Sequence, residues 1–249
     1  MSTNAVITQH ITAITFPFYG HTRPLLNMVK RMLKEHPALL FTVFVHASMY
    51  EKVQAVLGSN VGDASQRVDL SRARIIGVGA VSKEGGLGAT LRYPIEIDAA
   101  IQANYPALFN GGDITCSVTQ SALSFNNITP PTLVISDLFS SISGKIVKEI
   151  TPSVKLLMWF SSTTMHFIDV FGPEELSGKG DLEKAASAVF SDETQRAGRS
   201  LVEIATSLVE NRDSKIVDIP GIPLMYDYEM TPQQPFLPPM TQMFLDAVR

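Results

Sequence analysis

Short, uniformly apolar runs rich in β-branched residues recur along the chain, and each is followed by a stretch of helical character. The four or five runs are His10–Phe16, Leu39–His46, Ala73–Val78, Thr132–Ser136 and Val154–Phe160. They are too uniformly apolar to be half-exposed strands, which would alternate apolar and polar residues. This pattern predicts buried strands of a parallel sheet.

The intervening stretches carry the apolar periodicity of helices. They are His21–Glu35, Tyr50–Leu57, Ile95–Leu108, Ser140–Ile150 and Ser162–Phe171. Alternation of strand and helix at this spacing predicts an α/β fold: a doubly wound, mostly parallel, Rossmann-like sheet with helices on both faces. Ligands bind outside the carboxyl ends of the strands in such sheets, so the glycine-rich segment Gly79–Pro94 is expected to be a loop beside a ligand site.

Beyond Gly172-Pro173 the pattern is looser. Helices are expected at Leu182–Val189 and Thr194–Val209, and a further helix over Met240–Val248 reaches the last residues without a capping signal. We expect a single domain over residues 1–249 that belongs to a longer protein.

The composition excludes several classes of partner. The net charge is −4, with Lys and Arg scattered along the chain, so nucleic acid is not an expected partner. Cys116 is the only cysteine, which excludes an intrachain disulfide and favours a reduced compartment. The chain has no basic, apolar leader, and its apolar runs are shorter than the roughly 20 residues of a membrane span. A cytoplasmic protein without a transmembrane segment is expected.

The first strand-to-helix turn holds a histidine where a dinucleotide-binding fold carries Gly-x-Gly-x-x-Gly. This turn has one glycine, Gly20, followed by His21. A single glycine argues against a nicotinamide or flavin site. A histidine in the positive field at the amino end of a helix is favoured in its neutral form, which suits a general base. The alternative is that His21 caps the helix or packs against the sheet.

Asp137 ends the fourth run, so its carboxylate should emerge at the same sheet edge as His21. There it could bond the imidazole, fix its tautomer and stabilise the imidazolium. The alternative is an N-cap for the next helix, and the two roles compete for the same oxygens. The other histidines considered, His10, His36 and His46, are expected to be structural or on the surface.

Three segments together resemble the UDP-dependent glycosyltransferases that act on small lipophilic acceptors. They are Pro17–Leu26 (PFYGHTRPLL), Ser136–Phe139 (SDLF) and Ile219–Pro223 (IPGIP), in the family's order and spacing. The family has two facing Rossmann-like domains, and this chain resembles the amino-terminal, acceptor-binding one. The resemblance implies that His21 is the catalytic base, that Asp137 is its partner, and that a UDP-sugar bound by a carboxyl-terminal domain is the co-substrate. It implies neither a metal nor another cofactor.

The resemblance also assigns substrate contacts. The acceptor contacts are Phe18, Tyr19 and Gly20 before the histidine, Phe139 after the aspartate, and His166 on a later helix. Ser161, or Ser162 in a shifted register, corresponds to a residue that touches the donor sugar. Core packing is the alternative for Phe18 and Phe139, and it is the preferred interpretation for Trp159.

Three other functions remain open from the sequence. The chain could be one subunit of a bipartite transferase, a non-catalytic carrier that uses the same aromatic pocket, or a plain nucleotide-binding Rossmann domain.

Overall fold

The structure is a computed structural model of the 249-residue chain. It describes residues 6–58, 70–81, 92–162, 164–176, 178, 180–210, 214–219, 221–230 and 238–248. The chain divides into two compact units, Met1–Ser161 and Ser162–Arg249. The expectation of one domain over the whole length stays a prediction, and each unit is described by itself.

The first unit contains a five-stranded sheet in the order β3-β2-β1-β6-β7, in which every neighbouring pair is parallel. The strands are β1 (Gln9–Ile14), β2 (Leu39–His46), β3 (Ala73–Val78), β6 (Leu133–Asp137) and β7 (Lys155–Trp159). All five come from the predicted runs; the bounds of β2 and β3 agree with prediction and the others differ by one or two residues. The predicted Rossmann-like α/β fold class is therefore confirmed.

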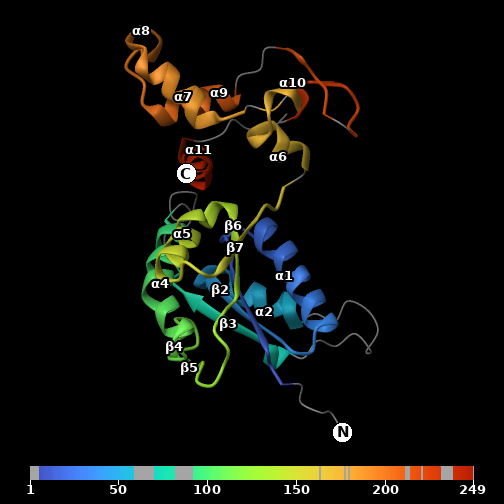
Figure 1. The fold of residues 1–249 in the computed structure, drawn as a ribbon, viewed down its shortest axis with the longest axis vertical. Coiled ribbons are helices and arrows are strands. Elements are labelled where there is room, and N and C mark those ends of the chain that lie inside the picture. The colour runs from blue at the N-terminus through green and yellow to red at the C-terminus, as the bar shows by residue number, and fades with distance from the viewer. Residues whose placement is uncertain are drawn as a thin grey trace. The chain divides into compact units, whose positions relative to one another are not determined.

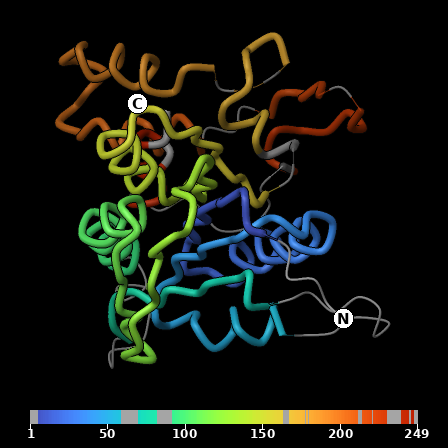
Figure 2. The backbone as a smooth tube through the Cα atoms, turned by 60° about the horizontal axis from the view of Figure 1, so that its bottom comes forward, coloured from blue at the N-terminus to red at the C-terminus, as the bar shows by residue number. Residues whose placement is uncertain are grey.

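Helices cover both faces of this sheet (Figure 1). Helices α1 (Tyr19–Glu35) and α2 (Tyr50–Gly58) lie on one face, and α4 (Tyr93–Phe109) and α5 (Ser141–Ile150) run side by side on the other (Figure 2). Each face has its own apolar core, because successive side chains of a strand point to opposite faces. Ala13 and Val43 belong to the core under α1, whereas Ile14, Phe44 and Val134 belong to the core under α4.

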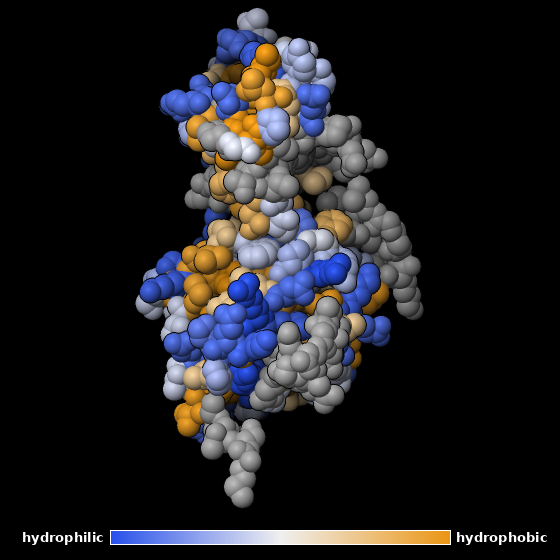
Figure 3. Space-filling model, turned by 90° about the vertical axis from the view of Figure 1, so that its right-hand side faces the viewer, coloured by the Kyte–Doolittle hydropathy of each residue, from blue (hydrophilic) through white to orange (hydrophobic). Residues whose placement is uncertain are grey.

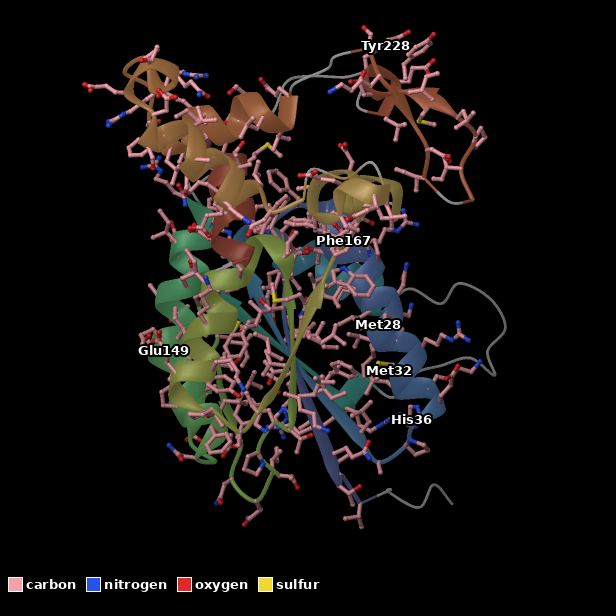
Figure 4. The ribbon with its side chains drawn as sticks, turned by 45° about the horizontal axis from the view of Figure 1, so that its top comes forward. Met28, Met32, His36, Glu149, Phe167 and Tyr228 are labelled. Atoms are coloured by element: carbon pink, nitrogen blue, oxygen red, sulfur yellow. The ribbon has the colours of Figure 1, made fainter. Side chains whose placement is uncertain are left out.

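Helix α1 forms because its sequence is amphipathic. Leu25, Leu26, Val29 and Leu33 are buried at helical spacing against the sheet. Figure 3, which faces the side of α1 and α2, shows hydrophilic residues gathered over this part of the first unit. His36 follows the carboxyl end of α1, one helix length away from His21 (Figure 4).

The two central strands, β1 and β6, form the topological switch point of the sheet. The chain leaves β1 toward α1 on one face and leaves β6 toward α5 on the other. Connections that diverge in this way leave a crevice at the carboxyl ends of the two strands, where open α/β sheets bind ligands.

A small hairpin and several helices complete the described chain. Strands β4 (Asp113–Thr115) and β5 (Ala122–Ser124) pair antiparallel in the first unit. In the second unit, β8 and β9 pair antiparallel and the helices carry their own apolar cluster. These elements are α6 (Thr164–Phe171), α7 (Leu182–Ser191), α8 (Glu193–Arg196), α9 (Leu201–Glu210), β8 (Ile216–Val217), β9 (Met225–Tyr226), α10 (Asp227–Met230) and α11 (Pro238–Val248).

Two sequence expectations differ from the structure. The helix predicted over Thr194–Val209 is wrong, because Ala197 (φ 48°) and Gly198 (φ 76°) adopt left-handed backbone that separates α8 from α9. The loop predicted over Gly79–Pro94 ends earlier, since α4 begins at Tyr93 and Pro94 suits a first helical turn. Residues 82–91 of that loop lie outside the described residues.

None of the helices in the described ranges combines the length and the apolar character that crossing a membrane requires.

His10 joins three segments at the amino-terminal edge of the sheet. Its Nδ1 donates a hydrogen bond to the Thr129 carbonyl (2.9 Å), and its Nε2 accepts one from the Thr42 hydroxyl (2.8 Å). The side chain is completely buried, and this desolvation lowers the pKa of His10 from 6.5 to about 4. His10 is therefore a structural residue, as the sequence predicts.

This buried imidazole should make the fold sensitive to acid. The unfolded chain binds a proton at His10 below pH 6.5, but the folded chain binds it only near pH 4. The unfolded state thus binds more protons in this window, and the free energy of unfolding should fall by about 3 kcal/mol as pH decreases through it. Urea titrations between these pH values should show a smaller decrease in the free energy of unfolding for His10→Gln than for wild type. The exposed control His36→Gln should behave like wild type, and equal pH dependence in all three proteins would disprove this role of His10.

Candidate active site

His21 lies in the first turn of α1, directly after the chain leaves β1. Phe18 is the N-cap residue, and its carbonyl accepts hydrogen bonds from the His21 and Thr22 amides. The Thr22 hydroxyl donates to the Phe16 carbonyl at 2.7 Å and ties the turn to the end of the strand. The first turn of α1 contains no acidic side chain, so the positive end of the helix dipole is not offset by a carboxylate of the helix itself.

Asp137 is the last residue of β6 and is 1% exposed. Its Oδ1 accepts a hydrogen bond of 3.0 Å from the Phe139 amide, which caps the short 3-10 helix Leu138–Ser140. A buried carboxylate is unfavourable unless its oxygens are bonded. The hydrogen bond from the Phe139 amide therefore fixes the Asp137 carboxylate and directs its other oxygen toward α1.

The structure brings His21 and Asp137 together across the switch point. His21 Nδ1 lies 3.0 Å from Asp137 Oδ2 and 3.3 Å from Oδ1. Because a carboxylate only accepts, Nδ1 carries a proton, and in the neutral imidazole Nε2 then keeps its lone pair. Asp137 thus serves both as N-cap and as partner of the imidazole, and the side chain of His21 is 24% exposed.

Three phenylalanine rings surround the His21 imidazole. Ring centroids of Phe16, Phe139 and Phe18 lie 5.3, 5.2 and 6.3 Å from that of His21. Phe16 is buried, whereas Phe18 is 37% exposed and Phe139 is half-buried. Phe18 and Phe139 were candidates from the sequence, and Phe16 was not. The sequence signal for Phe16 was its place at the end of an apolar run, which indicates only core packing.

Tyr19 and Gly20 do not join this aromatic cluster. Tyr19 is 43% exposed, and its ring lies 5.9 Å from the Arg23 guanidinium carbon and 6.0 Å from Lys52 Nζ. Residues two positions apart on a helix face different directions, which agrees with the position of the Tyr19 ring beside these two cations. Gly20 faces open space, since an added Cβ would have no neighbour within 4 Å.

The remaining candidates lie further along the chain. Ser161 follows β7 by two residues, and no hydrogen bond described in the structure joins it to His21 or Asp137. His166 lies on α6 in the second unit, and its side chain lies outside the described residues. Trp159 packs against the core under α1, as the sequence predicts.

A second histidine–carboxylate pair, which sequence reasoning missed, occurs at the same edge of the sheet. His46 ends β2, and its Nε2 lies 3.2 Å from Oε2 of Glu96 in the first turn of α4. The only sequence signal was a histidine at the end of a strand. Within the described part of the chain, no three His, Cys, Asp or Glu side chains gather into a possible metal site.

No family model matches the sequence. Among solved structures, the chain is similar to a UDP-glucosyltransferase from Polygonum tinctorium, with 13% identity and a TM-score of 0.46 over 96% of this chain and 43% of that chain. A Medicago truncatula protein complexed with UDP-glucose gives 17% identity and 0.45 over 86% and 37%. A transferase from Siraitia grosvenorii in complex with UDP gives 12% and 0.40 over 79% and 34%.

These neighbours are UDP-glycosyltransferases, the class that the sequence motifs resemble. The chain spans 34% to 43% of the length of these solved chains. The fold class itself rests on the parallel sheet and its covering helices described above.

The hydrogen bond between His21 and Asp137 should determine the tautomer of His21. In the wild-type chain at neutral pH, nitrogen-15 NMR of the imidazoles should show His21 protonated at Nδ1. Asp137→Ala removes the acceptor, so the proton should move largely to Nε2, the nitrogen that carries it in most free imidazoles. Asp181→Ala, which removes the N-cap of α7, is the matched control and should leave the His21 signals unchanged. An unchanged tautomer in Asp137→Ala would contradict the assigned bond.

Proposed function

We propose that this chain supplies the acceptor site and the catalytic base of an enzyme that transfers a sugar from a UDP-sugar to a hydroxyl of a small lipophilic acceptor. One observation carries the proposal: the 3.0 Å contact that joins His21 to the buried Asp137 at the switch point of the sheet. The three family-like sequence segments support the same reaction.

The reaction needs a base that is neutral and accessible before the transfer. His21 Nε2 removes the proton of the acceptor hydroxyl while the oxygen attacks the anomeric carbon from the face opposite UDP. The bond to UDP breaks with both electrons, so UDP leaves as an anion and the anomeric configuration inverts. Asp137 stabilises the imidazolium that forms, as a carboxylate does for the histidine of a catalytic triad.

Aromatic walls favour a planar or lipophilic acceptor. Phe18 and Phe139 each present a ring beside the imidazole, and both are accessible in part. Stacked or edge-on contacts with such rings hold an aromatic acceptor with its hydroxyl toward Nε2.

The UDP-sugar is assigned to a carboxyl-terminal nucleotide-binding domain that is not part of this chain. The first turn supports this division, since Gly20 is its only glycine and a histidine replaces the phosphate-binding pattern. On this proposal the chain alone does not transfer sugar, the reaction uses neither a metal nor another cofactor, and the enzyme works in the cytoplasm.

Replacement of the base should remove transfer. In an enzyme that joins this chain to its nucleotide-binding half, His21→Ala should lower the turnover with a phenolic acceptor by roughly a hundred- to ten-thousand-fold, the usual contribution of general-base catalysis. Turnover is measured as UDP release under saturating donor.

The control for this experiment is His36→Ala, which removes an exposed imidazole at the other end of α1. Both variants should give the circular dichroism spectrum of wild type. Turnover close to wild type in a folded His21→Ala enzyme would refute the assigned role.

A further inference from the structure

The His46–Glu96 pair holds a carboxylate in place at the carboxyl edge of the sheet. Glu96 Oε2 accepts a hydrogen bond from His46 Nε2 at 3.2 Å and another from the Ala80 amide at 3.0 Å. Both bonds reach the same oxygen. The other oxygen, Oε1, accepts no hydrogen bond from the residues that the structure describes, and the side chain is 40% exposed.

His46 cannot itself act as a base. Its side chain is completely buried, and its Nδ1 accepts a hydrogen bond of 3.2 Å from the Ser48 amide. The proton is therefore on Nε2, and this N–H donates a hydrogen bond to Glu96. The Tyr93 ring stacks on the imidazole at 3.9 Å between centroids and fills the remaining face. The role left to His46 is to position Glu96.

The charges of the pair agree with this geometry. Burial lowers the pKa of His46, although the hydrogen bond to Glu96 and the negative charge of that carboxylate oppose the shift. Burial raises the pKa of Glu96, but the hydrogen bonds from Ala80 and His46 and the charge of Arg92 oppose this effect, and the pKa of Glu96 is lowered overall. An ionised carboxylate beside a neutral imidazole is thus favoured near neutral pH.

The backbone is shaped to allow this arrangement. Gly79 has φ +69°, and a Cβ at this position would collide with Glu96 Oε2 and His46 Nε2. Glycine alone accepts both the left-handed backbone and the close approach. Glu96 is carried by α4 and is also held by His46 at the end of β2 and by the Ala80 amide in the loop that follows β3. An ordinary surface glutamate has no such fixed partners.

The carboxylate lies at the same edge of the sheet as His21, because His46, which holds it, ends β2. Strands β1 and β2 are neighbours with Ile14 opposite Phe44, so Phe16 and His46 lie two residues further along the two chains. Adjacent strands are about 5 Å apart, and the Phe16 ring lies 5.3 Å from the His21 ring. These two spacings place His46 on the order of 10 Å from the His21 ring, and Glu96 Oε2 lies 3.2 Å from His46 Nε2. An elongated acceptor of two aromatic rings fits a separation of this order.

We propose that Glu96 determines acceptor specificity: its Oε1 accepts a hydrogen bond from a second hydroxyl at the end of a two-ring acceptor remote from the hydroxyl that His21 deprotonates. His46 is the positioning residue for this contact. The inference rests on the proposed function of the His21 site. It narrows the acceptor class to elongated diols and polyphenols.

Binding to the 249-residue chain tests this assignment without any transfer reaction. The probes are para,para′-biphenol, with a hydroxyl at each end, and para-phenylphenol, with one. Calorimetry should show the diol binding roughly tenfold tighter to wild type, as expected for one hydrogen bond to a charged group. The diol should also shift the NMR signal of the Ala80 amide, which donates a hydrogen bond to the same carboxylate.

Glu96→Ala should reduce the affinity ratio of diol to monool to about one and leave the monool affinity unchanged. His46→Asn should lower the ratio in part, because the carboxylate is less well held. Glu149→Ala, which removes an exposed glutamate of α5 (Figure 4), is the matched control and should keep the wild-type ratio. An unchanged ratio in Glu96→Ala, or a chain that binds neither probe, overturns the assignment of Glu96. The base is tested separately by the His21→Ala turnover, so the two proposals can fail independently.

Discussion

The hydrogen bond between His21 and Asp137 depends on features of the whole sheet. Asp137 is buried at the end of β6, where a carboxylate is stable only if its oxygens are bonded. The Phe139 amide satisfies one oxygen and the His21 imidazole satisfies the other. Because β1 and β6 are hydrogen-bonded neighbours whose connections diverge to opposite faces, the two side chains meet in the crevice that this topology leaves open.

The same topology explains why a second pair can share the edge. His46 ends β2, the neighbour of β1, and Glu96 lies in the first turn of α4, the helix on the opposite face from α1. Asp137 is buried and bonds a partly exposed imidazole, whereas Glu96 is partly exposed and is itself held by a buried imidazole. Similar side chains thus have different roles because their exposure differs.

Much of the sheet could be predicted because buried parallel strands are recognisable as uniform apolar runs. The positions of His21 and Asp137 at one edge of the sheet could be predicted for the same reason, since each comes at or after the end of such a run. The break at Ala197 could not, because alanine favours helix and its left-handed backbone is set by the local fold. The assignment of Tyr19 to the acceptor site rests on the resemblance alone and stays a prediction. Glu96 lies 50 residues from His46 in a contact that only the folded chain reveals.

A double-mutant cycle on the enzyme that includes the nucleotide-binding half tests the central claim most directly. Turnover is compared in wild type, His21→Ala, Asp137→Ala and the variant with both changes. If Asp137 acts only through His21, its removal should cost almost nothing once His21 is absent, so the double variant should be no slower than His21→Ala. Losses that simply multiply would show that the two side chains act independently, and would contradict the account.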